Sequence, residues 1–535
     1  MASDISKTGN TAPAGMHLDR RRFIGSAGAA VGGLALTSTL GATAAQAATP
    51  PAAVTGHHPP RDPGRSARRK ATAFGIGYEC WFYPGGNQAG EIIWDSTEAK
   101  PVLGYYSSMD THVIKQHAEW ISKAGMDFIL IDWSNGVFDN ITQATLKLLD
   151  VYSTLRTHPK VAFLIGLDNG QPSAKAISLL ETEVLDKPDR ARHLQLFHGK
   201  PLLSVYGVSP VAAPPTFENP RFTTRYMNAF HEIVMNPWGN WSWEDRNPIA
   251  NGPMKPLPQF SAGNFNGWTA AGNWSLGDAG YLGTYATSEP AGGTATGSLT
   301  SPAFTVTERA FTFMASGADT QPKASGSYRT IAEFGQRNLF VLTDAKSGEV
   351  LRHAEPPGWT PVGFLPPSLQ NSTGPVWYLR QWDLTGLEGR SVRFQAVNNS
   401  PGGPNFGWMA VGGVAQTSPE QMTAMVSTPG NAVYGAWTDW DAHARNSGAS
   451  LVAAMQGVYD FEPEVALVQQ WNEFGSPDQF SVSLSNDIEP TVINNLAGAD
   501  SDGWGFYYLD LVTKLIRQYR EGAAFPAVAL DTRYP

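Results

Sequence analysis

The sequence has very little cysteine and none of the common cofactor motifs, and each absence excludes a class of protein. Cys80 is the single cysteine among 535 residues, which excludes an internal disulfide framework and a cysteine-based zinc site; we expect this lone thiol to be buried. The eleven histidines show no H-E-x-x-H pattern and no paired spacing. The chain also lacks a P-loop, a G-x-S-x-G elbow and a dinucleotide fingerprint that opens a helix. We therefore expect neither a metal nor a cofactor.

Charge is scarce as well, and its balance does not suit anionic partners. Charged residues make up 16% of the chain and the formal net charge is −9. A negative chain repels nucleic acid and anionic membrane surfaces. The hydrophobic share of 42% excludes a disordered chain, and 17 Trp and 17 Tyr supply many flat, amphipathic rings. We predict a folded protein that binds neither nucleic acid nor, in its mature form, a membrane.

Residues 1–47 have the pattern of a bacterial twin-arginine signal peptide. Arg20 to Arg22 precede an Ala- and Gly-rich apolar run, residues 23–36, which is too short to span a bilayer stably. An A-x-A cleavage site follows at Ala45–Ala47. We predict a secreted protein that leaves the cell folded through the twin-arginine export machinery; the alternative is a membrane anchor or a buried helix. Because the leader carries a net +2, the mature chain carries −11.

Apolar strands alternate with amphipathic helices between residue 73 and about residue 225. One helix is predicted over 110–124, with Asp110 as its N-cap, His117 in its apolar stripe and Gly125 at its end. The predicted strands cover 73–78, 128–131, 161–165 and 201–206, and a second helix covers 142–156. This alternation is typical of a parallel sheet with both faces covered by helices.

The pattern changes between about residue 260 and residue 416, where helical periodicity disappears and Gly, Ser and Thr become frequent. Short runs at 310–314, 339–342 and 392–397 predict the strands of a β-sandwich. The α/β pattern then resumes, with a strand at 465–470 and a closing helix over 505–519. We therefore predict an α/β fold, a (β/α)₈ TIM-like barrel interrupted by an inserted all-β sandwich domain. The predicted boundaries are signal peptide 1–47, flexible linker 48–72, first part of the barrel 73–258, sandwich 259–418 and second part of the barrel 419–535.

The candidate catalytic cluster directly follows the apolar strand at 465–470. Trp471, Asn472 and Glu473 stand there in sequence. Barrels keep their chemistry at the carboxyl ends of their strands, and a Glu at that place can act as an acid, a base or a nucleophile. The Trp can stack on a ring and the Asn can bind hydroxyls, which suits a sugar. The alternative is a Glu held in a structural ion pair.

Other carboxylates and rings follow other predicted strands. Glycoside hydrolysis ordinarily uses two carboxyl groups. The partner of Glu473 could be Asp168, Asp439 or Asp478, but we favour Asp132 and Glu79 as the catalytic candidates. Asp132 and Asp168 could instead be helix N-caps, and Glu79 could face a neighbour rather than the barrel mouth. The rings could also be plain core. The candidate substrate-binding residues are Trp81, Tyr83, Tyr106, Trp133, Asp168, Asn169, Trp437, Asp439, Trp471 and Asn472.

Two groups of motifs resemble glycoside hydrolase family 99, which contains endo-α-mannosidases and endo-α-mannanases, and the related WbsX-like bacterial proteins. The early group comprises Leu103–Asp110, Val113, Ile114, His117 and Asp132-Trp133; the late group comprises Trp471–Phe474 and Asp487–Pro490, similar to a W-N-E-W…(I/L)-E-P signature. The resemblance covers residues 75–206 and 433–520. It implies a (β/α)₈ barrel and retaining cleavage of α-linked glycosides without a metal. Residues 263–268, 297–304, 382–384 and 407–408 resemble glycosidase-associated β-sandwich modules, which bind glycan or brace a catalytic domain.

The catalytic residues of that family carry over only in part. One family carboxylate is thought to deprotonate the sugar's own 2-hydroxyl and so form a 1,2-anhydro intermediate, and a second, three residues later, acts as general acid and then base. Glu473 matches the first, whereas the second position is Ser476, which cannot act as a carboxylic acid; Asp478 is a shifted candidate. We predict a secreted glycoside hydrolase with a glycan substrate. The alternatives are a catalytically inactive, carbohydrate-binding barrel and a structural or surface-assembly protein.

Overall fold

The computed structural model describes most of the chain after the predicted leader. The described residues are 71–83, 94, 99–134, 136–208, 219–228, 254–278, 284–288, 296–317, 328–356, 378–399, 408–417, 423–427, 448–474, 487–494, 501–531 and 533. The predicted signal peptide, and the predicted linker up to residue 70, lie outside them. None of the helices within these ranges has both the length and the apolar character needed to cross a membrane.

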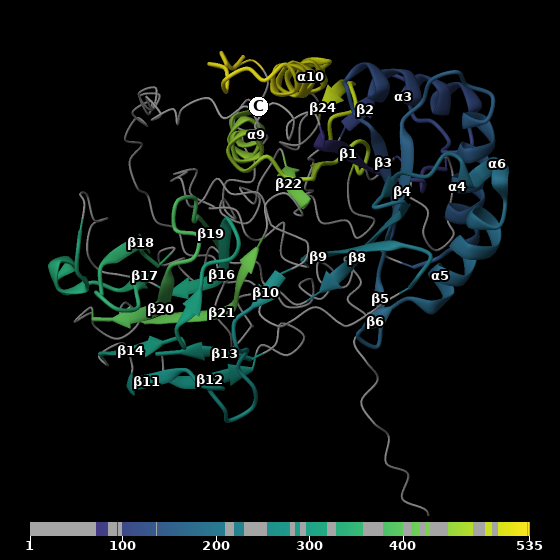
Figure 1. The fold of residues 1–535 in the computed structure, drawn as a ribbon. Helices are drawn as coiled ribbons and strands as arrows, with labels where there is room; N and C mark the ends of the chain where they lie inside the picture. Colours follow the sequence, from purple (N-terminus) through teal and green to yellow (C-terminus); the bar gives the residue numbers. More distant parts are fainter. Residues whose placement is uncertain are drawn as a thin grey trace, which may run out of the picture.

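A curled sheet forms the α/β part of the molecule (Figure 1). Its strands are β1 (Ala73–Tyr78), β3 (Phe128–Trp133), β4 (Lys160–Ile165), β7 (Leu196–Phe197), β8 (Lys200–Val208), β9 (Thr223–Asn228), β22 (Thr423–Ser427) and β23 (Val465–Gln469). The parallel strands lie in the order β9–β8–β4–β3–β1–β23–β22, and β7 pairs antiparallel with β8. The strands predicted at 73–78, 128–131, 161–165, 201–206 and 465–470 are therefore confirmed, with ends shifted by a few residues.

The parallel sheet covers part of the closed barrel that the sequence predicts. The chain runs in order from β1 to β9 across the sheet, and β22 and β23 return to the other side of β1, so segments far apart in sequence share one sheet. Within the described ranges the sheet curls into a half-barrel, and no pairing joins β9 to β22.

Side chains alternate between the two faces of this sheet, and the alternation decides which ones can reach the inside of the curl. Ile129, Ile131 and Trp133 of β3 belong to the core that packs under the helices. A Cβ at Gly75 of β1 would overlap the Phe128 ring, so both residues lie on the inner face, where the ring fills the space that the glycine leaves. Asp132 shares the inner face with Phe128 because the two residues are four apart on one strand.

Helices cover the outer face of the sheet (Figure 1). They are α3 (Thr111–Lys123), α4 (Asp139–Tyr152), α5 (Ala174–Leu179), a π-helical turn (Leu180–Leu185), α6 (Pro188–Ala191), α9 (Ala449–Phe461) and α10 (Tyr507–Arg520). The prediction for α3 is confirmed, since the Asp110 side chain accepts the His112 N–H at 2.7 Å and Gly125 has a φ of +84°.

Two predicted helix boundaries differ from the structure. Helix α4 starts three residues earlier than predicted and stops at Tyr152, where the Ser153 hydroxyl bonds back to the Leu149 carbonyl. Helix α10 starts at Tyr507 because Gly505 ends a strand, β25 (Ser501–Gly505). That strand forms a small sheet with β2 (Ala99–Pro101) and β24 (Thr491–Asn494).

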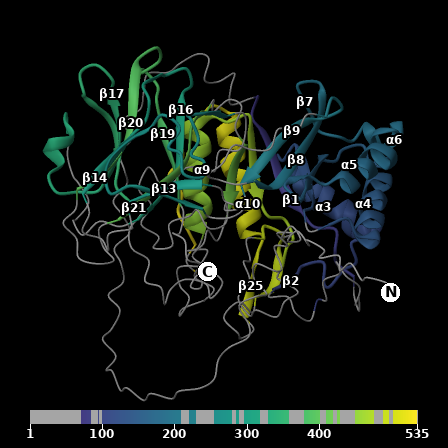
Figure 2. The ribbon, with the colours of Figure 1, turned by 90° about the horizontal axis from the view of Figure 1, so that it is seen from below.

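Two six-stranded antiparallel sheets occupy the middle of the chain. One contains β10 (Met254–Pro256), β12 (Ser275–Asp278), β13 (Thr284–Thr287), β16 (Ala310–Gly317), β19 (Tyr378–Asp383) and β21 (Met409–Thr417); the other contains β11 (Thr269–Gly272), β14 (Gly297–Thr300), β15 (Phe304–Thr305), β17 (Leu339–Asp344), β18 (Val350–Ala354) and β20 (Ser391–Asn398). Figure 2 shows them to one side of the parallel sheet. Phe313 of the first sheet packs on Phe340 and Phe394 of the second.

The tryptophans in this region that the structure describes lie mostly in its core. Trp268, Trp274 and Trp382 are all buried and belong to one cluster between the sheets. This placement agrees with the bracing role considered for the sandwich. The domain boundaries drawn from the sequence stay a prediction.

Candidate active site

Three carboxylates follow three neighbouring strands at the carboxyl edge of the parallel sheet. Glu79 comes directly after β1, Asp132 lies at the end of β3 and Glu473 follows β23. Tyr78 and Ile131 are register partners, so Glu79 and Asp132 end their strands at the same level. The Trp471 N–H bonds to the Gly77 carbonyl at 2.8 Å and continues the β1–β23 pairing toward Glu473. All three carboxylates are buried.

Asp487 holds the backbone around Glu473. Its carboxylate accepts the backbone N–H of Glu473 through one oxygen and that of Phe474, at 3.0 Å, through the other. Phe474 is fully buried and has a φ of +46°, a left-handed conformation that a bulky residue adopts only where its surroundings impose it. The Glu473 side chain therefore leaves a strained, tightly bonded turn, a feature that clusters at functional sites.

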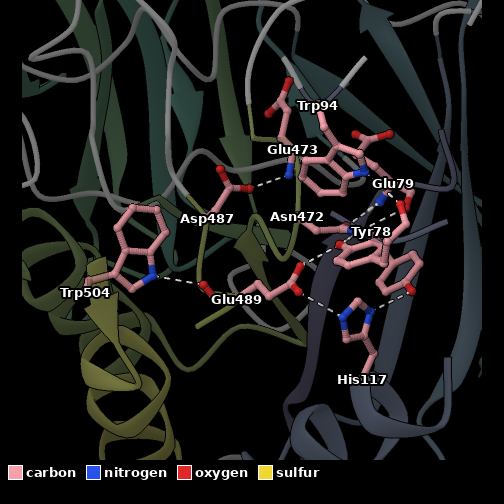
Figure 3. Close-up of polar contacts among 10 residues, drawn as sticks. Tyr78, Glu79, Trp94, His117, Asn472, Glu473, Asp487, Glu489 and Trp504 are labelled. Carbon is pink, nitrogen blue, oxygen red and sulfur yellow. Dashed lines mark hydrogen bonds and ion pairs between the residues drawn. The ribbon is translucent and has the colours of Figure 1, made fainter. Parts of the chain in front are cut away.

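Asn472 ties Glu473's segment to Glu79 (Figure 3). Its Oδ1 accepts the Glu79 backbone N–H at 2.8 Å, and its Nδ2 donates to the Glu79 carbonyl at 3.1 Å. The second Nδ2 proton goes to the Tyr106 hydroxyl, also at 3.1 Å. The side chain is fully buried, and these bonds commit its amide to protein groups. The Gln470 amide in turn donates to the Glu79 carboxylate.

A chain of buried polar groups continues from Asn472 (Figure 3). The Tyr106 hydroxyl donates to Glu489 Oε2 at 2.7 Å, and Glu489 Oε1 lies 3.0 Å from His117 Nε2. His117 Nδ1 lies 2.9 Å from the Tyr78 hydroxyl. The Trp504 indole N–H holds the Glu489 carbonyl at 2.9 Å. The chain joins helix α3, strand β1 and two loops at the carboxyl edge of the sheet.

Burial sets the ionisation of the hydroxyl and thiol groups around the site. Desolvation, followed by the nearby Glu489 charge, raises the pKa of Tyr106 well above its usual value, so its proton stays available to donate. Desolvation likewise raises the pKa of Tyr78. It also raises the pKa of Cys80 to about 12, which keeps that thiol protonated at neutral pH. The expectation that Cys80 is buried is confirmed.

The rings proposed as a sugar platform are largely enclosed. Trp133 is 1% exposed, its indole donates to the Thr145 hydroxyl of α4 at 3.2 Å, and it packs on Phe163 on the helix side of the sheet. Trp471 is buried against His117, and Trp81 is buried too. Strand alternation explains Trp133, because the residue after an inward Asp132 must point outward.

The remaining rings use their polar groups within the protein. The half-buried Tyr83 donates its hydroxyl to the Asn140 carbonyl at 2.6 Å. Tyr106 is buried, and its carbonyl accepts the Trp94 indole N–H at 2.7 Å. Tyr106 and Asn472 thus meet at the site through hydrogen bonds to neighbouring residues. Trp437, Asp439, Ser476 and Asp478 lie outside the described residues.

Asp168 and Asn169 lie in a tight hairpin. Strands β5 (Leu167–Asp168) and β6 (Gln171–Pro172) pair antiparallel around Asn169 and Gly170, which have φ values of +52° and +77°. Asn-Gly is a common dipeptide in such turns, so the hairpin could have been predicted from the sequence. The N-cap alternatives for Asp132 and Asp168 are wrong, because Phe138 and Ser173 occupy the N-cap positions of α4 and α5.

His117, Asp487 and Glu489 are site residues to which sequence reasoning gave no role. The sequence places His117 in an apolar stripe, and all three residues belong to the motifs that resemble family 99, without a role of their own. Within the described ranges, no group of three or more His, Cys, Asp and Glu side chains is arranged to hold a metal ion.

Parts of the chain are similar to solved structures. No protein-family model and no curated protein matches it. One similar structure is a GH99 endo-alpha-mannosidase from Bacteroides thetaiotaomicron in complex with BIS-TRIS-propane, 26% identical over 25% of this chain and 41% of that chain, with a TM-score of 0.20. A second structure of the endo-alpha-mannosidase from Bacteroides thetaiotaomicron is 24% identical over 26% and 47%, with a TM-score of 0.21.

A family 29 carbohydrate binding module is 12% identical over 31% of this chain and 88% of that chain, with a TM-score of 0.18. The chain spans less than half the length of the two mannosidase chains. TM-scores this low say nothing about the fold or the activity of this chain. The proposal below therefore depends on the geometry of the site.

Proposed function

We propose that the protein is a carbohydrate-active enzyme that hydrolyses glycosidic bonds in an oligo- or polysaccharide, with Glu473 as its principal catalytic carboxylate. The observation that carries the proposal is the clamp between the segment of Glu473 and the backbone of a second buried acidic residue. Asn472, next to Glu473 in sequence, bonds both backbone groups of Glu79. The two carboxylates therefore leave backbones that are fixed to one another at the carboxyl edge of a parallel sheet.

This arrangement supplies the two carboxyl groups that glycoside hydrolysis ordinarily requires. One carboxyl group protonates the leaving oxygen, and another attacks the sugar or activates water. Figure 3 shows the Glu473 and Glu79 carboxylates on the same side of Asn472. Asp132 adds a carboxylate at the end of the next strand. The pattern of the leader supports secretion through the twin-arginine machinery as part of the same proposal.

A binding protein without catalysis is the second candidate. The observation that favours it is Ser476, which stands where the family 99 motif places its second carboxylate. Under this alternative the carboxylates would hold sugar hydroxyls, and the protein would retain glycan without releasing product. Product release and glycan retention are therefore measured together on one panel of polysaccharides.

The test replaces Glu473 by Gln, which keeps the size of the side chain and removes its acid–base chemistry. We expect the mature wild type to release reducing ends from one or more α-linked polysaccharides, and Glu473→Gln to lose at least about 10³-fold in kcat, since it removes a group that acts in the transition state. Glu462→Gln is the matched control, because Glu462 is also a buried carboxylate but precedes the first residue of β23, at the end of the strand away from Glu473. Full activity in Glu473→Gln would refute the assignment, and retention without release in the wild type would favour the binding protein.

A further inference from the structure

The buried chain Tyr78–His117–Glu489–Tyr106 ends on Asn472, the residue that clamps Glu79. We propose that this chain is a positioning relay. It sets the orientation of Asn472 and thereby the separation of the Glu79 and Glu473 backbones. The inference rests on the proposed function for its kinetic consequence, whereas its structural part stands without it.

The bonds around Asn472 allow one orientation of its amide. The carbonyl oxygen must face the Glu79 N–H, and both amide protons then have acceptors, the Glu79 carbonyl and the Tyr106 oxygen. A flipped amide would place an NH₂ group against an N–H donor. The Tyr106 oxygen can accept from Asn472 because its own proton goes to Glu489 Oε2. Through Tyr106, Glu489 therefore reinforces the orientation of the Asn472 amide that the Glu79 backbone already favours.

Glu489 is itself fixed from several directions. His117 Nε2 meets its second carboxylate oxygen, and Trp504 holds its carbonyl. The Glu489 N–H bonds to the Trp471 carbonyl at 2.9 Å, so the residue is also tied to the segment after β23 that carries Asn472. Glu489 and His117 are 0% and 1% exposed.

Stability alone is a poor explanation for this chain. Burying a carboxylate with an imidazole costs desolvation, and apolar residues of similar size often serve the fold as well or better. What such a chain supplies is a single geometry, because each member has one arrangement that satisfies its donors and acceptors. A site that must hold two carboxylates at a set separation gains from that property, since a misplacement of about 1 Å can cost about 100-fold in rate.

Tyr106→Phe tests the relay, because it removes the hydroxyl that links Asn472 to Glu489 and leaves the ring in place. We expect kcat to fall about 10- to 100-fold while KM stays within about twofold. We also expect the backbone N–H of Glu79 to exchange with deuterium at least about tenfold faster, because the Asn472 amide that protects it is then held by one bond fewer. Exchange is read by mass spectrometry on peptides that contain Glu79.

Tyr459→Phe is the matched control. Tyr459 is 1% exposed and donates its hydroxyl to the Leu515 carbonyl at 2.7 Å, so the variant also loses a buried hydrogen bond, between α9 and α10. We expect its kcat and its Glu79 exchange to match the wild type. Wild-type exchange at Glu79 in Tyr106→Phe would overturn the inference, and so would faster exchange with unchanged kcat in an active enzyme. If the wild type cleaves no glycan, the proposed function fails, and the exchange measurement alone still decides whether Tyr106 orients Asn472.

Discussion

The turn that carries Glu473 gives the sharpest test of how the site is held, through the substitution Asp487→Asn. The Asp487 carboxylate is fully buried and bonds the backbone N–H groups of Glu473 and Phe474. Asn has nearly the same shape but offers one oxygen, so its NH₂ group must oppose one of the two N–H donors. Asp487→Asn therefore leaves one buried donor unsatisfied without creating a cavity.

The size of the effect follows from those two bonds. A hydrogen bond to a charged group contributes about 1.5–3 kcal/mol, and an unsatisfied buried donor costs about 1–3 kcal/mol. The left-handed conformation of Phe474, at a φ of +46°, costs about 1–3 kcal/mol of backbone strain. The turn recovers this strain energy when it relaxes. We expect the free energy of opening this turn to fall by about 3 kcal/mol, with part of the lost bonding offset by the released strain.

Local hydrogen exchange measures that opening directly. Because about 1.4 kcal/mol corresponds to tenfold in an equilibrium constant, the amides of Glu473 and Phe474 should exchange about 100-fold faster in Asp487→Asn. The matched control is Asp344→Asn in the antiparallel region, where an Asp accepts the N–H groups of Lys346 and Ser347 in an exposed turn. Both N–H groups there share one carboxylate oxygen, which Asn retains, so the site amides and kcat should not change. Wild-type exchange at Glu473 in Asp487→Asn would refute the reasoning.

Two further predictions concern groups outside the carboxylate cluster. Burial, followed by the charges of His158, Arg192 and Lys160, lowers the pKa of His193 to about 4. An imidazole whose pKa is lower in the folded than in the unfolded protein stabilises the fold above its unfolded pKa of about 6.5, and this stability, at most about 3 kcal/mol, is lost as the pH falls toward 4. In chemical denaturation, the free energy of unfolding of His193→Gln should therefore fall less steeply than that of the wild type between those pH values. An unchanged slope would contradict this. Because burial raises the pKa of Cys80 to about 12, iodoacetamide at pH 8 should label the thiol only after denaturation, and labelling of the native protein would contradict its placement.

Local patterns in the sequence predicted the local parts of the fold. Apolar runs located the parallel strands, and Asp110 and Gly125 located the ends of α3. The face of the sheet on which a strand residue lies can also be predicted from the sequence, since an inward Asp132 requires an outward Trp133. Asp132 and Trp133 are both candidate site residues in the sequence, although only one of two adjacent strand residues can point into the curl. The Asn169-Gly170 dipeptide is a second local signal in the sequence, because Asn-Gly is typical of a tight hairpin turn.

The organisation of the site could not be read in the same way, because its bonds join residues that are far apart in sequence. His117 meets Glu489 across 372 positions, and Asn472 meets Glu79 across 393. On α3 alone, His117 occupies an apolar stripe and has the pattern of a core residue. Its partner becomes apparent only when the sheet brings β1 beside β23 and Glu489 meets His117 of α3.

The same long-range pairing bears on the serine at position 476. The family 99 motif spaces its two carboxylates three residues apart on one segment, so their separation follows from local geometry. In the proposed hydrolysis the second carboxylate comes instead from a different strand, and Asn472 holds the two backbones together by bonding the N–H and the carbonyl of Glu79. A side-chain clamp between neighbouring strands can replace short sequence spacing as the means of holding two carboxylates apart. The proposed hydrolysis therefore takes Glu79 as the carboxyl partner of Glu473 and does not need a carboxylate at position 476.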